Sequence, residues 1–243
     1  MFRINTISFV IIFLVTINAA AQEVKDPAIH GTRSEVKVAD VSTMHQGETS
    51  GDFLTSGSRS SYQGEPSGMF LCDSFTEGIV EFSGGITYEP IRLRYNLYFQ
   101  QMQFVRNGDT LAFANPEELK KVILGNKNFI FLAFKNKRML DSSYFEVISE
   151  GRCRLLKRHY IKYHFSAADV PDEEEYIYQT SLYVKKGTEP AIPLRKCKKA
   201  VCCAFPDKKE EIKDFIKTNN LKMRHTEDIM LVVEYYNRIS SER

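Results

Sequence analysis

The chain has 243 residues and a formal net charge of +2, and 12% of its residues are aromatic although it contains no tryptophan. This near-balanced charge argues against a dedicated nucleic-acid binder, which normally carries a strongly basic domain. The length fits one domain or two intimate subdomains, with enough Phe and Tyr to fill a core.

Residues 1–21 have the three parts of a secretory signal peptide. Arg3 supplies a positive charge, residues 7–17 form an apolar run, and Ala19, Ala20 and Ala21 offer small residues before a cleavage point. The run is shorter than the roughly 20 residues that cross a bilayer, although an N-terminal anchor helix is the alternative. No cysteine follows, so no lipoprotein is expected. We expect an exported periplasmic or envelope protein with no transmembrane segment in the mature chain.

Residues 22–68 predict a flexible leader, because they are rich in Ser, Gly, Thr and charge and show no periodicity. A short pairing around residues 34–41 is the one weak exception. From residue 69 to 193 the pattern predicts an antiparallel β region. Residues 90–99 alternate between apolar and polar side chains, as a half-buried strand does.

Turn signals divide this β region. The parity of the apolar residues changes near Gln100 and Gln101, which predicts a bulge or tight turn there. An Asn-Gly pair at residues 107–108 predicts a hairpin, and "SGG" at 83–85 predicts another. Residues 115–124 begin with Asn, Pro and two acids, which favours one short helix.

Residues 194–243 change to a helical period and predict a C-terminal helical part of about three helices. The expected helices cover residues 194–205, 206–218 and 227–239. The order of elements gives an α+β fold: an antiparallel sheet, followed by a small helical subdomain.

Three thiols fall within the expected first helix. At 100° per residue, Cys197 shares an apolar stripe with Leu194, Val201 and Phe205, whereas Cys202 and Cys203 lie off it. Three thiols that point in different directions cannot converge on one zinc ion, so no metal site is expected. Cys197 is therefore expected to be a packing residue.

The other two cysteines could form a disulfide. Cys153 shares strand parity with buried positions, and it would reach Cys72 if their two strands were neighbours. The sequence leaves this connectivity open. His159 and His164 are five residues apart and should face opposite ways, so each is interpreted as part of a solvated basic strand. No catalytic residues and no cofactor are expected.

A basic cluster is the strongest candidate for binding. Arg152, Arg154, Arg158 and Lys162 fall on one predicted strand and would hold a charged glycan or envelope lipid headgroups if they shared a face. The expected partner is an envelope protein or an anionic glycan. The alternative is that these cations pair with the acidic residues 172–175 across a hairpin.

Four stretches carry a resemblance: "MFLCDSFTEGIVEFSGG", "IRLRYNLYFQQMQFVRNGDTLAFANPEEL", "YFEVISEGRCRLLKRHY" and "FPDKKEEIKDFIKTNNLKMRHTEDIMLVVEYYN". Together they resemble a family of exported proteins of Bacteroidota to which no activity is assigned. The resemblance covers about residues 69–239, and it implies an envelope location and this architecture. It also implies that Cys197 and Cys202 stand where such proteins carry aliphatic residues.

The leading functional hypothesis is a non-catalytic periplasmic or envelope-associated protein that binds a partner or ligand through its sheet. The alternative is a periplasmic hydrolase whose site is assembled from distant residues. A purely structural envelope component is a third hypothesis. A site that gathers His159, an acid and a hydroxyl would favour the hydrolase.

Overall fold

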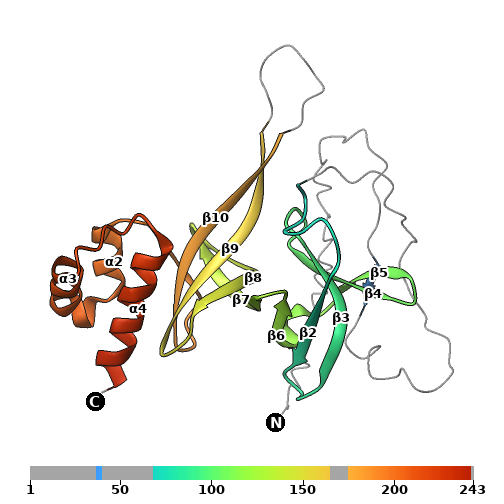
Figure 1. Cartoon of the computed structure of the whole chain (residues 1–243), viewed down its shortest axis with the longest axis horizontal. Coiled ribbons are helices and arrows are strands. Elements are labelled where there is room, and N and C mark those ends of the chain that lie inside the picture. Colours follow the sequence, from blue (N-terminus) through green and yellow to red (C-terminus); the bar gives the residue numbers. More distant parts are fainter. Residues whose placement is uncertain (1–36, 40–67, 165–174, 242–243) are drawn as a thin grey trace, which may run out of the picture. The chain divides into compact units, whose positions relative to one another are not determined.

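The computed structural model describes residues 37–39, 68–164 and 175–241. The predicted signal peptide, nearly all of the predicted leader and most of the acidic turn lie outside these ranges. The described residues form an 11-stranded sheet with the order β1-β5-β4-β3-β2-β6-β7-β8-β9-β10-β11 (Figure 1). The strands are β1 Lys37–Ala39, β2 Thr76–Phe82, β3 Thr87–Asn96, β4 Gln101–Arg106, β5 Asp109–Phe113, β6 Leu119–Leu124, β7 Lys127–Asn136, β8 Met139–Ser149, β9 Cys153–His164, β10 Glu175–Lys186 and β11 Ile192–Leu194.

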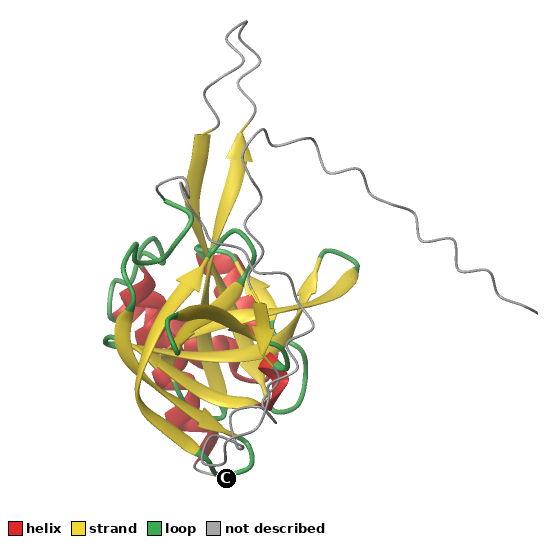
Figure 2. Cartoon of the chain, turned by 90° about the vertical axis from the view of Figure 1, so that its right-hand side faces the viewer, coloured by secondary structure: helices red, strands yellow, loops and turns green. Residues whose placement is uncertain are grey.

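Helices follow the sheet, so the predicted α+β class is confirmed. They are α2 Lys198–Ala204, α3 Lys209–Thr218 and α4 Thr226–Ser241, with short 3-10 turns η1 Pro116–Glu118 and η2 Pro206–Lys208. Figure 2 distinguishes these helices in red from the yellow strands. Neighbouring strands of the sheet are antiparallel except for β1, which pairs with β5 in parallel. The weak pairing signal at residues 34–41 therefore corresponds to a real strand.

The predicted turns are confirmed, and one predicted helix is wrong. Asn107 and Gly108 connect β4 to β5 with positive φ angles of 52° and 82°. Residues 115–124 form η1 and then strand β6 rather than a helix. The β-branched pair Val122 and Ile123 lies in a strand that is hydrogen-bonded on both sides, to β2 and to β7, and this pairing outweighs the local helix signal.

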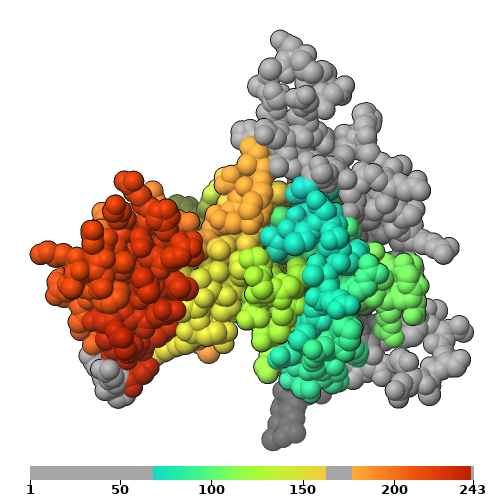
Figure 3. Space-filling model, viewed as in Figure 1, coloured from blue at the N-terminus to red at the C-terminus, as the bar shows by residue number. Residues whose placement is uncertain are grey.

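The buried residues form three clusters. The first packs β9, β10 and β11 against α2, α3 and α4, and it includes Leu155, Val184 and Val233. The second lies among β2 to β8 and includes Tyr95 and Phe129. The third is small and contains Phe134, Phe145, Leu156, Tyr183 and Ala191. In the space-filling view, the residues of β9 and β10 lie between the red helices and the green strands (Figure 3).

The strands around the third cluster close on themselves. Ala191, just before β11, pairs with Phe134 of β7 through a parallel bridge. Its carbonyl accepts from the Lys135 amide at 2.8 Å, and its amide donates to the Ala133 carbonyl at 3.0 Å. The strands β7 to β11 therefore form a ring that encloses the third cluster.

The turn between β3 and β4 fills a gap between β8 and β9. The ladder between these strands runs from Ser149 to Glu146 on β8 and does not continue toward Met139. Gln100, at φ 54°, donates from Nε2 to the His159 carbonyl at 3.0 Å, which lies beyond the end of that ladder. Its Oε1 accepts from the Ser143 hydroxyl at 2.6 Å and from the Tyr95 hydroxyl at 3.1 Å. The Gln100 side chain thus joins β8 and β9 at a place where these two strands are not paired with each other.

Candidate functional site

The four basic residues predicted to bind a ligand are mostly engaged within the chain. Arg152 precedes β9 and donates to the Ser240 carbonyl of α4 at 2.9 Å. Arg154 forms an ion pair with Glu150 at 2.8 Å. Lys162 is exposed in the register position opposite Ile177. Arg154, Arg158 and Lys162 share strand parity. However, Arg152, Arg154 and Arg158 already have partners within the chain.

Arg158 shows this most clearly. Its Nε donates to the Ser143 hydroxyl at 3.1 Å and to Gln100 Oε1 at 3.3 Å. Its guanidinium lies 4.8 Å from the centre of the Phe134 ring, at the third hydrophobic cluster. A guanidinium held in this way stabilises the sheet and is not a free cation for a ligand.

The structure does not bring Cys72 and Cys153 together. Both are free thiols: Cys72 is exposed in the segment before β2, and Cys153 is buried at the start of β9. Strands β6, β7 and β8 lie between β2 and β9 in the sheet, so the neighbouring strands that this disulfide required are absent. Burial raises the pKa of Cys153 to about 11, so it packs as a protonated thiol.

The packing cysteine of the C-terminal part is Cys202, and the prediction for Cys197 is wrong. Residues 192–194 form strand β11, and α2 begins only at Lys198 with Cys197 as its N-cap residue. Cys197 is therefore exposed, whereas Cys202 is 7% exposed within the first cluster. Cys203, the next residue on the helix, is exposed. The other predicted stripe residues, Leu194, Val201, Ala204 and Phe205, do lie in or against the first cluster. Only Cys197 was misplaced, because the predicted helix began four residues too early.

His159 was expected on a solvated strand, but it is buried, at 3% exposure. Its Nε2 lies 2.7 Å from Oε2 of Glu146 on β8, and its Nδ1 lies 2.5 Å from the hydroxyl of Tyr178 on β10. A carboxylate only accepts, so Nε2 carries a proton and donates to Glu146, while Nδ1 and the Tyr178 hydroxyl share a second hydrogen bond. Strand parity with Cys153 and Leu155 was the available signal that His159 faces inward.

Glu146 is the centre of this polar cluster. Lys127 lies 2.9 Å and Lys157 lies 3.6 Å from its carboxylate oxygens. Burial raises the pKa of Glu146, but hydrogen bonds from His159 and Lys127 and the charge of Lys157 outweigh burial and lower it to about 2. The raised pKa of Tyr178 follows from burial and from the negative charge of Glu146. The cluster therefore holds an ionised acid, an imidazole and a protonated phenol on three adjacent strands.

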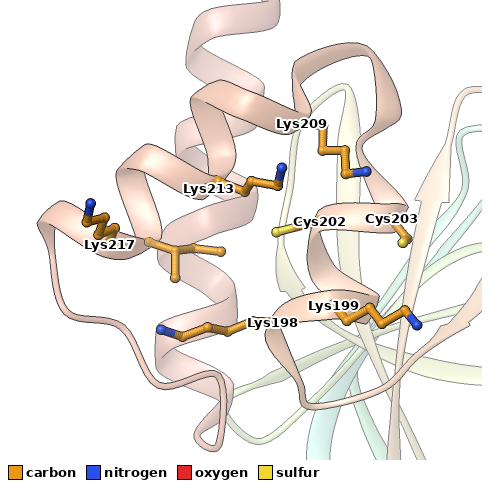
Figure 4. A pocket seen from close by; sticks show the side chains of 8 residues that line it. Lys198, Lys199, Cys202, Cys203, Lys209, Lys213 and Lys217 are labelled. Carbon is orange, nitrogen blue, oxygen red and sulfur yellow. The ribbon is translucent and has the colours of Figure 1, made fainter.

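A basic pocket lies between α2 and α3, outside the predicted site. Its volume is about 400 Å³, and its lining residues are Lys198, Lys199, Cys202, Cys203, Lys209, Lys213, Ile216 and Lys217. Figure 4 shows the lysines of α3 on one side of the Cys202 thiol and those of α2 on the other. Five lysines and no acid line this space.

Helical spacing produces the α3 side of the pocket. Lys209, Lys213 and Lys217 follow one another at intervals of four residues and therefore share a face. Like charges at this spacing destabilise a helix by about 0.2–0.5 kcal/mol per pair. Lys213 is paired with Glu210 at 2.7 Å. The described part of the chain supplies no carboxylate within ion-pair distance of Lys209 or Lys217.

Comparisons with known proteins give no match for this chain. No family model matches the chain, and neither a curated protein nor a solved structure matches it. Among the described residues, no helix is long and apolar enough to cross a membrane.

Proposed function

We propose that this protein is an exported, non-catalytic binding protein whose pocket between α2 and α3 holds a small polyanion. The observation that carries the proposal is a space of about 400 Å³ lined by five lysines and no acid. The whole chain has a net charge of only +2, so a general excess of lysine does not account for this concentration.

The arrangement of α3 supports a binding role over a purely structural one. A helix selected for stability alone would alternate acids with Lys209, Lys213 and Lys217, since opposite charges four residues apart stabilise it. The acids of α3 are Glu210, Glu211 and Asp214, which do not line the pocket. Glu210 pairs with Lys213, so Lys209 and Lys217 are the α3 cations whose repulsion an anion in the pocket would relieve.

The lining also indicates a chemical class. Lysine is a compact point charge without the planar fork of arginine, so it selects for negative charge more than for a fixed geometry. Ile216 and Cys202 add an apolar floor to the pocket. A small organic molecule with two or more phosphate, sulfate or carboxylate groups fits this lining. The charged end of an anionic glycan belongs to this class.

The predicted signal peptide and the resemblance to exported Bacteroidota proteins support a periplasmic or envelope location. In this proposal the ligand binds in the pocket and not at the basic cluster of Arg152, Arg154, Arg158 and Lys162. An envelope protein that carries such an anionic group would be a partner of the same pocket.

The experiment is calorimetric titration of the protein with tripolyphosphate and with a sulfated disaccharide. A variant with Lys198→Gln, Lys209→Gln and Lys217→Gln should bind at least about threefold more weakly, because each exposed charge contributes roughly 0.2–1 kcal/mol. The matched control removes three exposed lysines elsewhere: Lys120→Gln, Lys162→Gln and Lys222→Gln. Equal loss in both variants, or no binding by the unaltered protein, would refute the pocket.

A second candidate function is a periplasmic hydrolase, and the specific observation that favours it is the chain of hydrogen bonds from Glu146 through His159 to Tyr178. Tyr178 is 49% exposed, so it is the member that a substrate would contact. Turnover of chromogenic phosphate or carboxylate esters, lost in Tyr178→Phe but kept in the triple lysine variant, would establish this function. The absence of turnover by the unaltered protein would eliminate it for these esters.

A further inference from the structure

The tip of the β7–β8 hairpin exposes two adjacent large apolar side chains. Met139 is 74% exposed and Leu140 is 65% exposed, more than the other large apolar residues that are exposed in the described ranges, of which Tyr178 comes next at 49%. Single exposed apolar residues are ordinary, but two together at an exposed hairpin turn indicate a contact with something apolar.

The register of the hairpin decides what kind of contact this is. Met139 pairs with Asn136 and Leu140 pairs with Lys135, so the two apolar side chains are consecutive residues of β8. Consecutive strand residues point to opposite faces. A flat protein surface laid against one face would cover one of them and leave the other in water. A medium that surrounds the tip, such as the outer part of a bilayer, would cover both.

Charge at the tip matches such a surface. Lys135, Lys137 and Arg138 are exposed around the two apolar residues, and Asp141 is the one acid between residues 135 and 141. In the described part of the chain, none of these three cations has an ion-pair partner. Apolar side chains flanked by lysine and arginine are the composition that binds the interface of membranes with anionic headgroups.

The turn itself keeps a cation where the backbone favours glycine. Lys137 and Arg138 are the two residues between β7 and β8, and Lys137 has φ 55°. Gly, Asn and Asp are the usual residues at positive φ in two-residue hairpin turns. The left-handed conformation costs a residue with a Cβ atom roughly 1 kcal/mol. A lysine at this position is therefore not explained by the fold.

The hairpin is anchored to the rest of the sheet up to Lys135. Phe134 is fully buried, and the amide of Lys135 donates to the Ala191 carbonyl at 2.8 Å. The residues from Asn136 to Leu140 lie beyond this support. Insertion would therefore require no rearrangement of the sheet.

We propose that the hairpin tip, residues 135–140, docks the protein on a lipid surface that carries anionic headgroups. Met139 and Leu140 enter the boundary between headgroups and acyl chains, while Lys135, Lys137 and Arg138 contact the headgroup phosphates. This surface is distinct from the lysine pocket, whose lining residues all lie in α2 or α3.

Flotation with phosphatidylcholine vesicles, with and without phosphatidylglycerol, tests the proposal. The protein lacking residues 1–21 should be used, because the predicted signal peptide would itself bind lipid and its removal leaves every described residue in place. The protein should float with the anionic vesicles. Met139→Ser with Leu140→Ser should weaken binding about tenfold or more, as expected when two apolar side chains no longer leave water.

The charged residues are tested separately. Lys137→Gln with Arg138→Gln should remove most of the preference for anionic vesicles, about fivefold per cation. Leu231→Ser, at another exposed leucine, is the matched control and should leave binding unchanged. Failure to float with either vesicle overturns the proposal. Unchanged vesicle binding by the Met139→Ser/Leu140→Ser variant also overturns it. So does capture of an envelope protein in the absence of lipid, if this capture requires Met139 and Leu140.

Discussion

Glu146 on β8 and His159 on β9 are buried side by side, with the carboxylate Oε2 2.7 Å from the imidazole Nε2. They lie on the same face of the sheet as Leu155 and Val184 of the first cluster and Phe129 of the second. The pair is thus a polar link between two hydrophobic clusters, and its charge balance depends on Lys127 and Lys157.

This arrangement predicts a loss of stability in acid. The pKa of Glu146 is lowered from 4.5 to about 2 in the folded protein, so its contribution to stability is present above about pH 4.5 and is lost as the pH falls toward 2. At 1.36 kcal/mol per pKa unit, the contribution is on the order of 3 kcal/mol. Urea unfolding at a series of pH values between 7 and about 2.5 measures it.

The Glu146→Gln variant provides the control. It should be less stable at pH 7 by about 3 kcal/mol, because Lys127 and Lys157 lose their buried counter-charge. It should also lose less stability on acidification than the unaltered protein does. If both proteins lose the same amount between pH 5 and 3, another carboxylate is responsible.

Gln100 predicts a large effect for a turn residue. Gln100→Ala should destabilise the protein by about 2–3 kcal/mol, because the Ser143 and Arg158 side chains and the His159 carbonyl lose a partner in a half-buried site. Gln100→Gly removes the same side chain but suits the positive φ, so it should be about 1 kcal/mol less harmful. Urea unfolding at neutral pH distinguishes the two variants. A Gly variant more stable than the unaltered protein would mean that the side-chain contacts contribute little.

The cysteines predict a defined pattern of thiol reactivity. Without reductant, Cys72, Cys197 and Cys203 should react in the native protein because they are exposed, and Cys153 and Cys202 only after denaturation. If only three thiols react even after denaturation and Cys72 and Cys153 are the two that do not react, the Cys72–Cys153 disulfide exists after all. Unfolding measurements add a second readout: Cys202→Ala should cost about 1–2 kcal/mol and Cys197→Ala close to nothing, since only Cys202 packs in a core.

The hydrogen bonds of Asn237 join α4 to the sheet, so replacing this residue should destabilise the protein. Its Oδ1 accepts from the Cys153 amide at 2.8 Å, and its Nδ2 donates to the carbonyls of Cys153 and Glu150 at 2.9 and 3.1 Å. Asn237→Asp keeps the acceptor but places a charge against two carbonyls, and should cost about 2 kcal/mol in thermal or urea unfolding. Asn219→Asp, at the exposed end of α3, should cost less than about 1 kcal/mol. Similar losses in the two variants would contradict a specific role for Asn237.

The sequence predicted those parts of the fold that depend on local signals. The Asn107-Gly108 turn, the turn at Gln100 and the helices that became α3 and α4 follow from residue type and period within a few neighbours. The predicted start of α2 was wrong because β11 forms by pairing Leu194 with Leu182. Hydrophobic periodicity along the sequence carries no information about such a long-range pairing.

The candidate site was harder to predict for the same reason. The burial of His159 depends on Glu146 and Tyr178, which come from two other strands, and their approach requires the register of both ladders. The spacing of Lys209, Lys213 and Lys217 was visible in the sequence, but the position of α2 beside them was not. The pocket exists only because η2 returns the chain from α2 to α3 within three residues.

The closure of β7 onto Ala191 also bears on self-association. An open sheet offers unpaired peptide groups at its outermost strands, where another copy can add a strand and begin an aggregate. At one end of this sheet β11 is three residues long and is preceded by a residue already bonded to β7, and at the other end β1 is three residues long. Neither end, as far as the structure describes them, presents a long row of free amide and carbonyl groups, so the large sheet is poorly suited to templating fibrils.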